Sequence, residues 1–210
     1  MGNNMSMKQR IPYVTISLVA ANVIVFCLEL FAGGSEEPAV ALKAGALYVP
    51  LVLEEGQWFR LISSMFIHFG SQHLGSNMIS LFAIGPYVEA YFGRWRYLIL
   101  YFVSGLGGGL LTMAVEMITG RFALSAGASG AIFGLLAVLI IFAMTPGLRR
   151  FFPKSRVAAA VLFSLLPGLT EEGISMTAHL GGLVTGFILA WFMNRNKIKR
   201  LRSSNNLSEP

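Results

Sequence analysis

The sequence contains no aspartate, one cysteine and three histidines, and these shortages narrow the chemistry open to it. Without aspartate, neither an aspartate-dyad protease nor a Ser-His-Asp triad can be built. The single Cys27 lies in an apolar run, which excludes a disulfide framework and a paired-thiolate metal site. The zinc-protease signature HExxH is also missing, and we expect neither a metal nor a cofactor. Any imidazole base must be His68, His73 or His179.

Charge is also scarce. Only 12% of the 210 residues are charged, against about 25% in a typical soluble domain. Hydrophobic residues make up 55%, and the mean hydropathy is +0.65. So few charges cannot cover a soluble surface, so we expect lipid to surround most of the chain.

Six continuous apolar runs come close to or exceed the length that crosses about 30 Å of hydrocarbon. They cover residues 12–32, 72–92, 95–118, 129–145, 157–170 and 175–193. The fifth run is short and contains Pro167. Because the runs are continuous rather than alternating, a closed barrel is disfavoured. The sequence predicts an all-α membrane protein with six transmembrane helices.

The first run has a second interpretation as a signal peptide, because Lys8 and Arg10 precede it. It is long for the apolar part of such a peptide, and it ends at Glu29 and Gly33 without a clean cleavage site. Its length favours a retained helix.

The basic residues predict the orientation of the spans. If the N-terminus lies in the cytoplasm, only Lys43, Arg60 and Arg121 of the 16 Lys and Arg residues fall outside. This bias follows the positive-inside rule, and it accounts for the net charge of +6 without a nucleic-acid partner. We expect a cytoplasmic tail at 1–11, a membrane domain at 12–193 and a mobile, basic cytoplasmic tail at 194–210.

The segment from 35 to 70 differs from the other connections because it is long and partly apolar. Its stretches at 39–53 and 57–69 are amphipathic but too short to span, which is typical of segments lying at a membrane interface. Trp58 and Arg60 suit the headgroup level. We therefore expect a long first loop that is partly embedded in the membrane.

Polar residues begin the second, fourth and sixth runs, and each can be explained without a catalytic role. His73 and Asn77 share one helix face and can reach headgroups. Ser129, in GASG, can be a small packing residue next to the GxxxG pattern of the fourth run. His179 can be a satisfied donor between helices, or a haem ligand together with His73.

The predicted topology brings these residues to similar depth at the outer face, because all three runs start there. Glycines on the fourth and sixth runs permit close approach, so Ser129 and His179 can form a nucleophile and base. Asn77, His73 and the Ser129 backbone N–H can act as oxyanion donors. Apart from Glu171–Glu172, no acid is placed to complete a triad, which indicates a dyad. Phe133, one turn after the serine, can pack on the imidazole.

These motifs resemble the rhomboid family of intramembrane serine proteases over roughly residues 10–195. The match comprises WFRL at 58–61, HxxxxHLxxN at 68–77, GxxxExxxG at 85–93, GASG at 127–130 and AHLGGLVTG at 178–186.

The resemblance implies roles for the individual residues. Ser129 would be the nucleophile and His179 the general base, with His73, Asn77 and the Ser129 backbone holding the oxyanion. Gly127 would shape the loop before the serine, and Arg60 and Glu89 would be structural polar residues. His68 matches a recurrent family histidine, for which a structural or water-organising role competes with a catalytic one. Phe133 stands where a tyrosine is also common.

The resemblance further implies transmembrane protein substrates with a single span, cleaved in or near it, and no cofactor. It indicates the minimal six-helix form in a bacterial plasma membrane, with both termini cytoplasmic and the active site open to the outer face. A further hypothesis is that the short fifth helix and residues 169–175 move to admit substrate.

Two rival functions are a six-helix transporter or channel and a catalytically inactive relative that binds membrane proteins.

Overall fold

The computed structural model describes residues 11–145, 147–165 and 175–206, with side chains as far as residue 195. In these ranges the named elements are all helical, which confirms the all-α class. They are α1 (Tyr13–Phe31), α2 (Pro38–Ala44), α3 (Val49–Glu54), α4 (Arg60–Ser63), the 3-10 turn η1 (Ser64–Phe66), α5 (Gly70–Phe92), α6 (Arg94–Thr119), α7 (Ser129–Met144), α8 (Lys154–Leu165) and α10 (Met176–Asn206).

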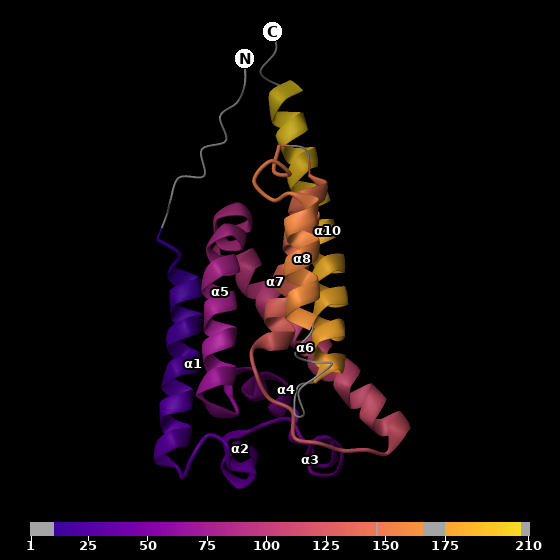
Figure 1. The fold of residues 1–210 in the computed structure, drawn as a ribbon. Helices are drawn as coiled ribbons and strands as arrows, with labels where there is room; N and C mark the ends of the chain where they lie inside the picture. The colour runs from indigo at the N-terminus through magenta and orange to yellow at the C-terminus, as the bar shows by residue number, and fades with distance from the viewer. Residues whose placement is uncertain (1–10, 146, 166–174, 207–210) are drawn as a thin grey trace.

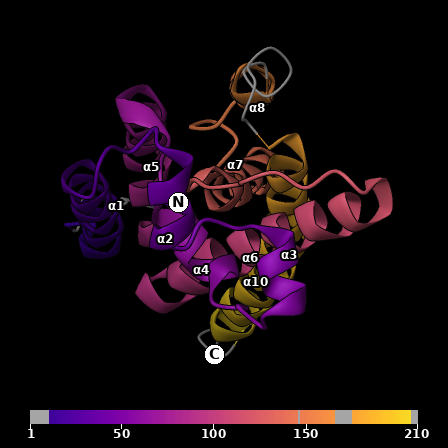
Figure 2. The ribbon, with the colours of Figure 1, turned by 90° about the horizontal axis from the view of Figure 1, so that it is seen from below.

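Helix α7 occupies the centre of the bundle (Figures 1 and 2). Helices α6 and α10 pack against it and against each other, α5 and α8 also contact it, and α1 lies on the far side of α5. Only Ser129, Ile140 and Met144 of its 16 residues are not buried. The short elements α2, α3 and α4 gather at the end of the bundle where α1 ends and where α5, α7 and α10 begin (Figure 1).

Three helices of the described chain are both long and apolar enough to cross a membrane: α1, α6 and the Met176–Arg195 part of α10. These helices make the chain an integral membrane protein of the all-α class. The predicted fifth run at 157–170 corresponds to α8 only as far as Leu165, and Pro167, Glu171–Glu172 and the loop at 169–175 lie largely outside the described residues.

The last helix is longer than the sequence analysis expected, because α10 continues to Asn206 rather than ending near residue 193. No glycine or proline follows Gly186 before residue 206, so the backbone has no stop signal there. Asn194 is buried and accepts a hydrogen bond from Tyr91 Oη at 2.7 Å, while its Nδ2 donates to Thr145 Oγ1 at 3.1 Å. This position therefore belongs to the bundle rather than to a free tail.

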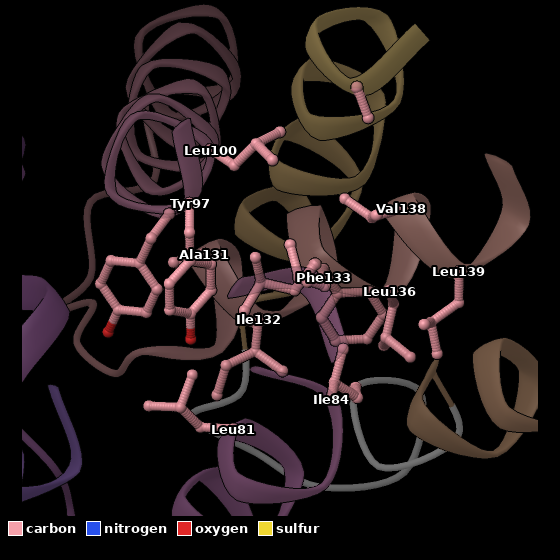
Figure 3. Close-up of a cluster of buried hydrophobic side chains, with 14 of the residues drawn as sticks. Leu81, Ile84, Tyr97, Leu100, Ala131, Ile132, Phe133, Leu136, Val138 and Leu139 are labelled. Atoms are coloured by element: carbon pink, nitrogen blue, oxygen red, sulfur yellow. The ribbon is translucent and has the colours of Figure 1, made fainter. Parts of the chain in front are cut away.

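The main core cluster forms where α7 meets α5 and α6 (Figure 3). Ile132, Phe133 and Leu136 of α7 pack there with Leu81 and Ile84 of α5. Where the backbones of α7 and α10 come closest, the contact is made by glycines. A Cβ at Gly182 would overlap the backbone of Gly130, and one at Gly186 would overlap Gly134. Small residues of this kind allow two helix backbones in a membrane to touch.

The side chain of Arg60 is buried within the first connection, which joins α1 to α5. One guanidinium nitrogen donates to the carbonyl oxygens of Leu42 at 2.9 Å and Ala46 at 2.7 Å, and Nε donates to Gln57 Oε1 at 2.7 Å. A buried cation needs such partners, because water is not there to solvate it. Trp58, in contrast, is exposed.

Glu89 ties α5 to the first turn of α1. Its carboxylate accepts hydrogen bonds from the backbone N–H groups of Val14 at 3.1 Å and Thr15 at 3.0 Å, and from Thr15 Oγ1 at 3.0 Å. The first N–H groups of a helix have no acceptor in their own helix, and the helix dipole favours a negative charge at that end. Glu89 thus fixes one end of α1 on the bundle.

Candidate active site

Backbone hydrogen bonds hold the segment before Ser129 against the connection between α1 and α5. Leu47 and Ser125 exchange two backbone hydrogen bonds, at 2.8 and 2.9 Å, and the Gly127 N–H donates to the Ser64 carbonyl at 2.8 Å. Gly127 has a φ of +122°, a conformation open essentially to glycine. This fixed entry places Ser129 at the first position of α7.

Ser129 and His179 are brought together from α7 and α10. Ser129 Oγ lies 2.9 Å from His179 Nε2, within hydrogen-bond distance. The glycine contacts between the two helices make this approach possible. When the hydroxyl donates to Nε2, the imidazole carries its proton on Nδ1. That atom is buried and has no hydrogen-bond partner in the described part of the chain.

Phe133 lies against the imidazole. Its ring stacks on that of His179, with centroids 4.2 Å apart and planes 16° from parallel. Both residues are buried. The stacked ring restricts rotation of the imidazole and keeps Nε2 directed at the serine.

His73 and Asn77 both lie on α5 and face the segment before the serine. A Cβ at Gly127 would lie 2.8 Å from His73 Nε2 and 3.6 Å from Asn77 Nδ2. Asn77 is 6% exposed, and its Nδ2 has no hydrogen-bond partner among the residues that the structure describes. A buried amide donor without an acceptor costs free energy, so it is suited to a group that arrives with the substrate.

His68 is fully buried and also contacts the segment that precedes Ser129. Its Nε2 accepts a hydrogen bond from the Ala128 N–H at 3.4 Å, and its Nδ1 lies 3.3 Å from the Phe66 carbonyl. Burial, together with the neighbouring His73, lowers the pKa of His68 from 6.5 to about 3. An imidazole held neutral in this way supports the backbone beside the serine and does not take up a proton near neutral pH.

Two polar residues at this site were absent from the sequence predictions. Ser64 supplies the carbonyl that holds Gly127, and Glu29 of α1 accepts a hydrogen bond from the His68 backbone N–H at 3.3 Å. Ser64 carries no sequence signal, because its contact uses only the backbone. Glu29 does carry one, since a carboxylate inside a predicted span is unusual.

A family model described as the Rhomboid domain matches residues 55–196. The Bacillus subtilis protein "Rhomboid protease GluP" is 30% identical over 182 residues, covering 85% of this chain and 34% of that protein. "RHOMBOID-like protein 5" of Arabidopsis thaliana is 37% identical over 154 residues, with 72% and 48% covered. "Putative rhomboid protease YdcA" of Bacillus subtilis is 33% identical over 151 residues, with 71% and 74% covered. The chain belongs to the rhomboid family.

The extent of these matches differs between relatives. The chain spans about a third of GluP and about half of RHOMBOID-like protein 5, but about three quarters of YdcA. The family model begins at residue 55, so α1, α2 and α3 precede the matched region. Ser129, His179, His73 and Asn77 all lie inside it.

Proposed function

We propose that this chain is an intramembrane serine endopeptidase that uses Ser129 and His179 as a catalytic dyad. The observation that carries the proposal is the 2.9 Å contact between Ser129 Oγ and His179 Nε2 at the start of two closely packed helices. A serine hydroxyl is a weak nucleophile, and an adjacent base with a fixed ring is what activates it. Relatives named as rhomboid proteases support the same assignment.

The reaction proceeds in two halves. In the first, His179 Nε2 takes the hydroxyl proton while Ser129 Oγ bonds to the scissile carbonyl carbon. The tetrahedral intermediate collapses, the C–N bond breaks, and the imidazolium gives its proton to the leaving amine. In the second, a water molecule passes a proton to His179, its oxygen attacks the acyl carbon, and Ser129 regains its proton as the acid product leaves.

In this proposal, hydrogen-bond donors beside Gly127 stabilise the negatively charged oxygen of the tetrahedral intermediate. The proposed donors are Asn77 Nδ2, a ring N–H of His73 and the backbone N–H of Ser129, of which the first two lie beside Gly127. The positive end of the α7 dipole would add to them. Because Gly127 lacks a Cβ, the space between it and His73 stays open for the carbonyl oxygen. No triad acid is required, which agrees with a sequence that has no aspartate.

The membrane arrangement belongs to the same proposal. Residues 12–193, together with the buried Asn194, form a six-span domain, and the first connection is partly embedded. Residues 1–11 and 195–210 face the cytoplasm of a bacterial plasma membrane. The 16 residues of α7 rise only about 24 Å, less than the roughly 30 Å of hydrocarbon. A central helix that is too short leaves Ser129 below the outer surface, in a depression that water can enter.

The proposed substrates are single-span membrane proteins, cut in or near the span. A small cavity lies beside Ser129 between the first connection, α6 and α10, and it is lined by Leu47, Met65, Gly105, Gly109 and Ala178, among others. Its small size suits a small side chain before the scissile bond. No nucleic acid and no cofactor take part.

The test is cleavage of a panel of single-span substrates reconstituted with the protein in liposomes. Wild-type protein is expected to release two fragments, while Ser129→Ala and His179→Ala release none. Equal cleavage by Ser129→Ala overturns the assignment of the nucleophile. Intact substrates with well-folded wild-type protein favour an inactive, membrane-protein-binding relative.

A further inference from the structure

Helix α1 buries a carboxylate that the proposed reaction does not use. Glu29 is 2% exposed, although it lies within an apolar helix. Its Oε1 is buried and has no hydrogen-bond partner in the part of the chain that the structure describes. Burying an ionisable group of this kind is costly in a membrane protein, and such groups are often functional.

The other oxygen of Glu29 has one hydrogen-bond partner among the described residues. Oε2 accepts a hydrogen bond from the backbone N–H of His68, 39 residues further along the chain, at 3.3 Å. His68 lies between η1 and α5, in a stretch with no helical hydrogen bonds of its own. Glu29 therefore fixes the position of the His68 backbone against α1.

The contacts continue from His68 to the nucleophile. The His68 ring accepts the Ala128 N–H at 3.4 Å, and Ala128 directly precedes Ser129. The same ring packs edge-on against His73, with centroids 5.0 Å apart. A displacement of His68 would thus reach both the serine and one of the oxyanion donors.

We propose that Glu29 is a positioning residue for this site, holding His68 so that its ring sets the place of Ala128, Ser129 and His73. The inference rests on the proposed protease function. Glu29 touches no reacting atom, and its effect on catalysis is entirely indirect. It would make α1, which lies outside the region matched by the family model, a support of the active site rather than only a membrane anchor.

A purely structural role for Glu29 would be to dock α1 on the bundle. The chain offers a matched control for that role, because α1 is docked at its other end by Thr15, which donates to Glu89. Thr15 and Glu29 are both buried on α1, but only Glu29 is connected to the segment before the serine. Thr15→Val should therefore loosen α1 without changing the chemistry at Ser129.

The experiment measures labelling of Ser129 by a fluorophosphonate in detergent, in which Oγ bonds to phosphorus, fluoride leaves and His179 receives the proton. The maximal labelling rate and the probe concentration at half that rate are measured separately. Glu29→Leu is expected to lower the maximal rate by tenfold or more, since misplacing a reacting group by about 1 Å can cost about 100-fold. The half-saturating probe concentration should not change. Glu29→Gln, which keeps an oxygen acceptor for the His68 N–H, should restore most of the rate.

A double variant tests the route through His68. If Glu29 acts through that ring, Glu29→Leu should cost little further rate once His68→Ala has removed it. Independent, multiplying losses overturn the proposal, as does a Glu29→Leu rate equal to that of wild type. The proposal is also overturned if Thr15→Val, at the same thermal stability as Glu29→Leu, loses as much of the labelling rate. If the wild-type protein is not labelled at all, the same experiment contradicts the proposed protease function rather than the role of Glu29.

Discussion

Phe133 stacks face to face on His179, with ring centroids 4.2 Å apart. The two residues come from different helices, and the ring covers one side of the imidazole whose Nε2 lies 2.9 Å from Ser129 Oγ. The orientation of the base therefore depends on packing as well as on hydrogen bonds. This contact makes the geometry of the pair testable by substitution.

Two substitutions of Phe133 test whether the aromatic ring itself matters for activity. Phe133→Tyr keeps the stacked ring and should retain nearly full peptidase activity. Phe133→Leu removes it, and an aromatic pair of this kind is worth about 0.5–1.5 kcal/mol, so a loss of kcat/KM of about twofold to thirteenfold is expected. Activity of Phe133→Leu equal to that of Phe133→Tyr would show that the stacking does not orient the base.

The approach of α7 to α10 depends on Gly182. A Cβ there would overlap the backbone of Gly130, so Gly182→Ala must push the helices apart or strain them, at a cost of about 1–3 kcal/mol. We expect lower thermal stability and a loss of Ser129 reactivity. Gly75 of α5 has nothing within 4 Å of its Cβ position, so Gly75→Ala should preserve both. Full reactivity in Gly182→Ala would contradict the role of this contact.

Gly127 should tolerate no side chain. Alanine there meets an unfavourable φ of +122° and places a Cβ 2.8 Å from His73 Nε2, in the space proposed for the oxyanion. Gly127→Ala is therefore expected to abolish cleavage. Gly120 also has a positive φ, +67°, but open space around its Cβ position. Gly120→Ala should cost about 1–2 kcal/mol of stability and leave the catalytic rate unchanged; a matching loss of rate there would assign the Gly127 effect to strain alone.

The buried His68 predicts how stability depends on pH. Its pKa is lowered to about 3 in the folded protein, so between there and 6.5 the unfolded chain binds a proton that the folded chain does not. Stability is therefore present above pH 6.5 and is lost as the pH falls, by up to about 1.4 kcal/mol for each pH unit. Unfolding midpoints in a denaturing detergent should fall more steeply in wild type than in His68→Gln between pH 6.5 and 5. Parallel curves would contradict the buried, neutral imidazole.

The sequence predicted the helical class, because long apolar runs and a low content of charged residues are consequences of the lipid solvent. It also predicted which polar residues would meet: Ser129, His179, His73 and Asn77 each begin a run that starts at one face. The described bounds of α1, α5, α6 and α7 fall within two residues of the predicted ones. The roles of these residues in catalysis remain predictions.

Other features could not be obtained from pattern alone. The burial of Arg60 depends on the carbonyls of Leu42 and Ala46, which only the folded loop brings together. The burial of Asn194 depends on Tyr91 and Thr145, which lie 103 and 49 residues away in sequence. Glu29 had a usable signal, since Thr15, Asn22 and Glu29 follow at intervals of seven on the buried face of α1.

The most direct measurement is mass-spectrometric mapping of the adduct formed when the detergent-solubilised protein reacts with a fluorophosphonate. The account predicts one adduct on the Ser129 hydroxyl, absent in Ser129→Ala and strongly slowed in His179→Ala, while both variants keep the thermal stability of wild type within a few degrees. An adduct on another serine, or unchanged labelling in His179→Ala, would contradict the Ser129–His179 dyad.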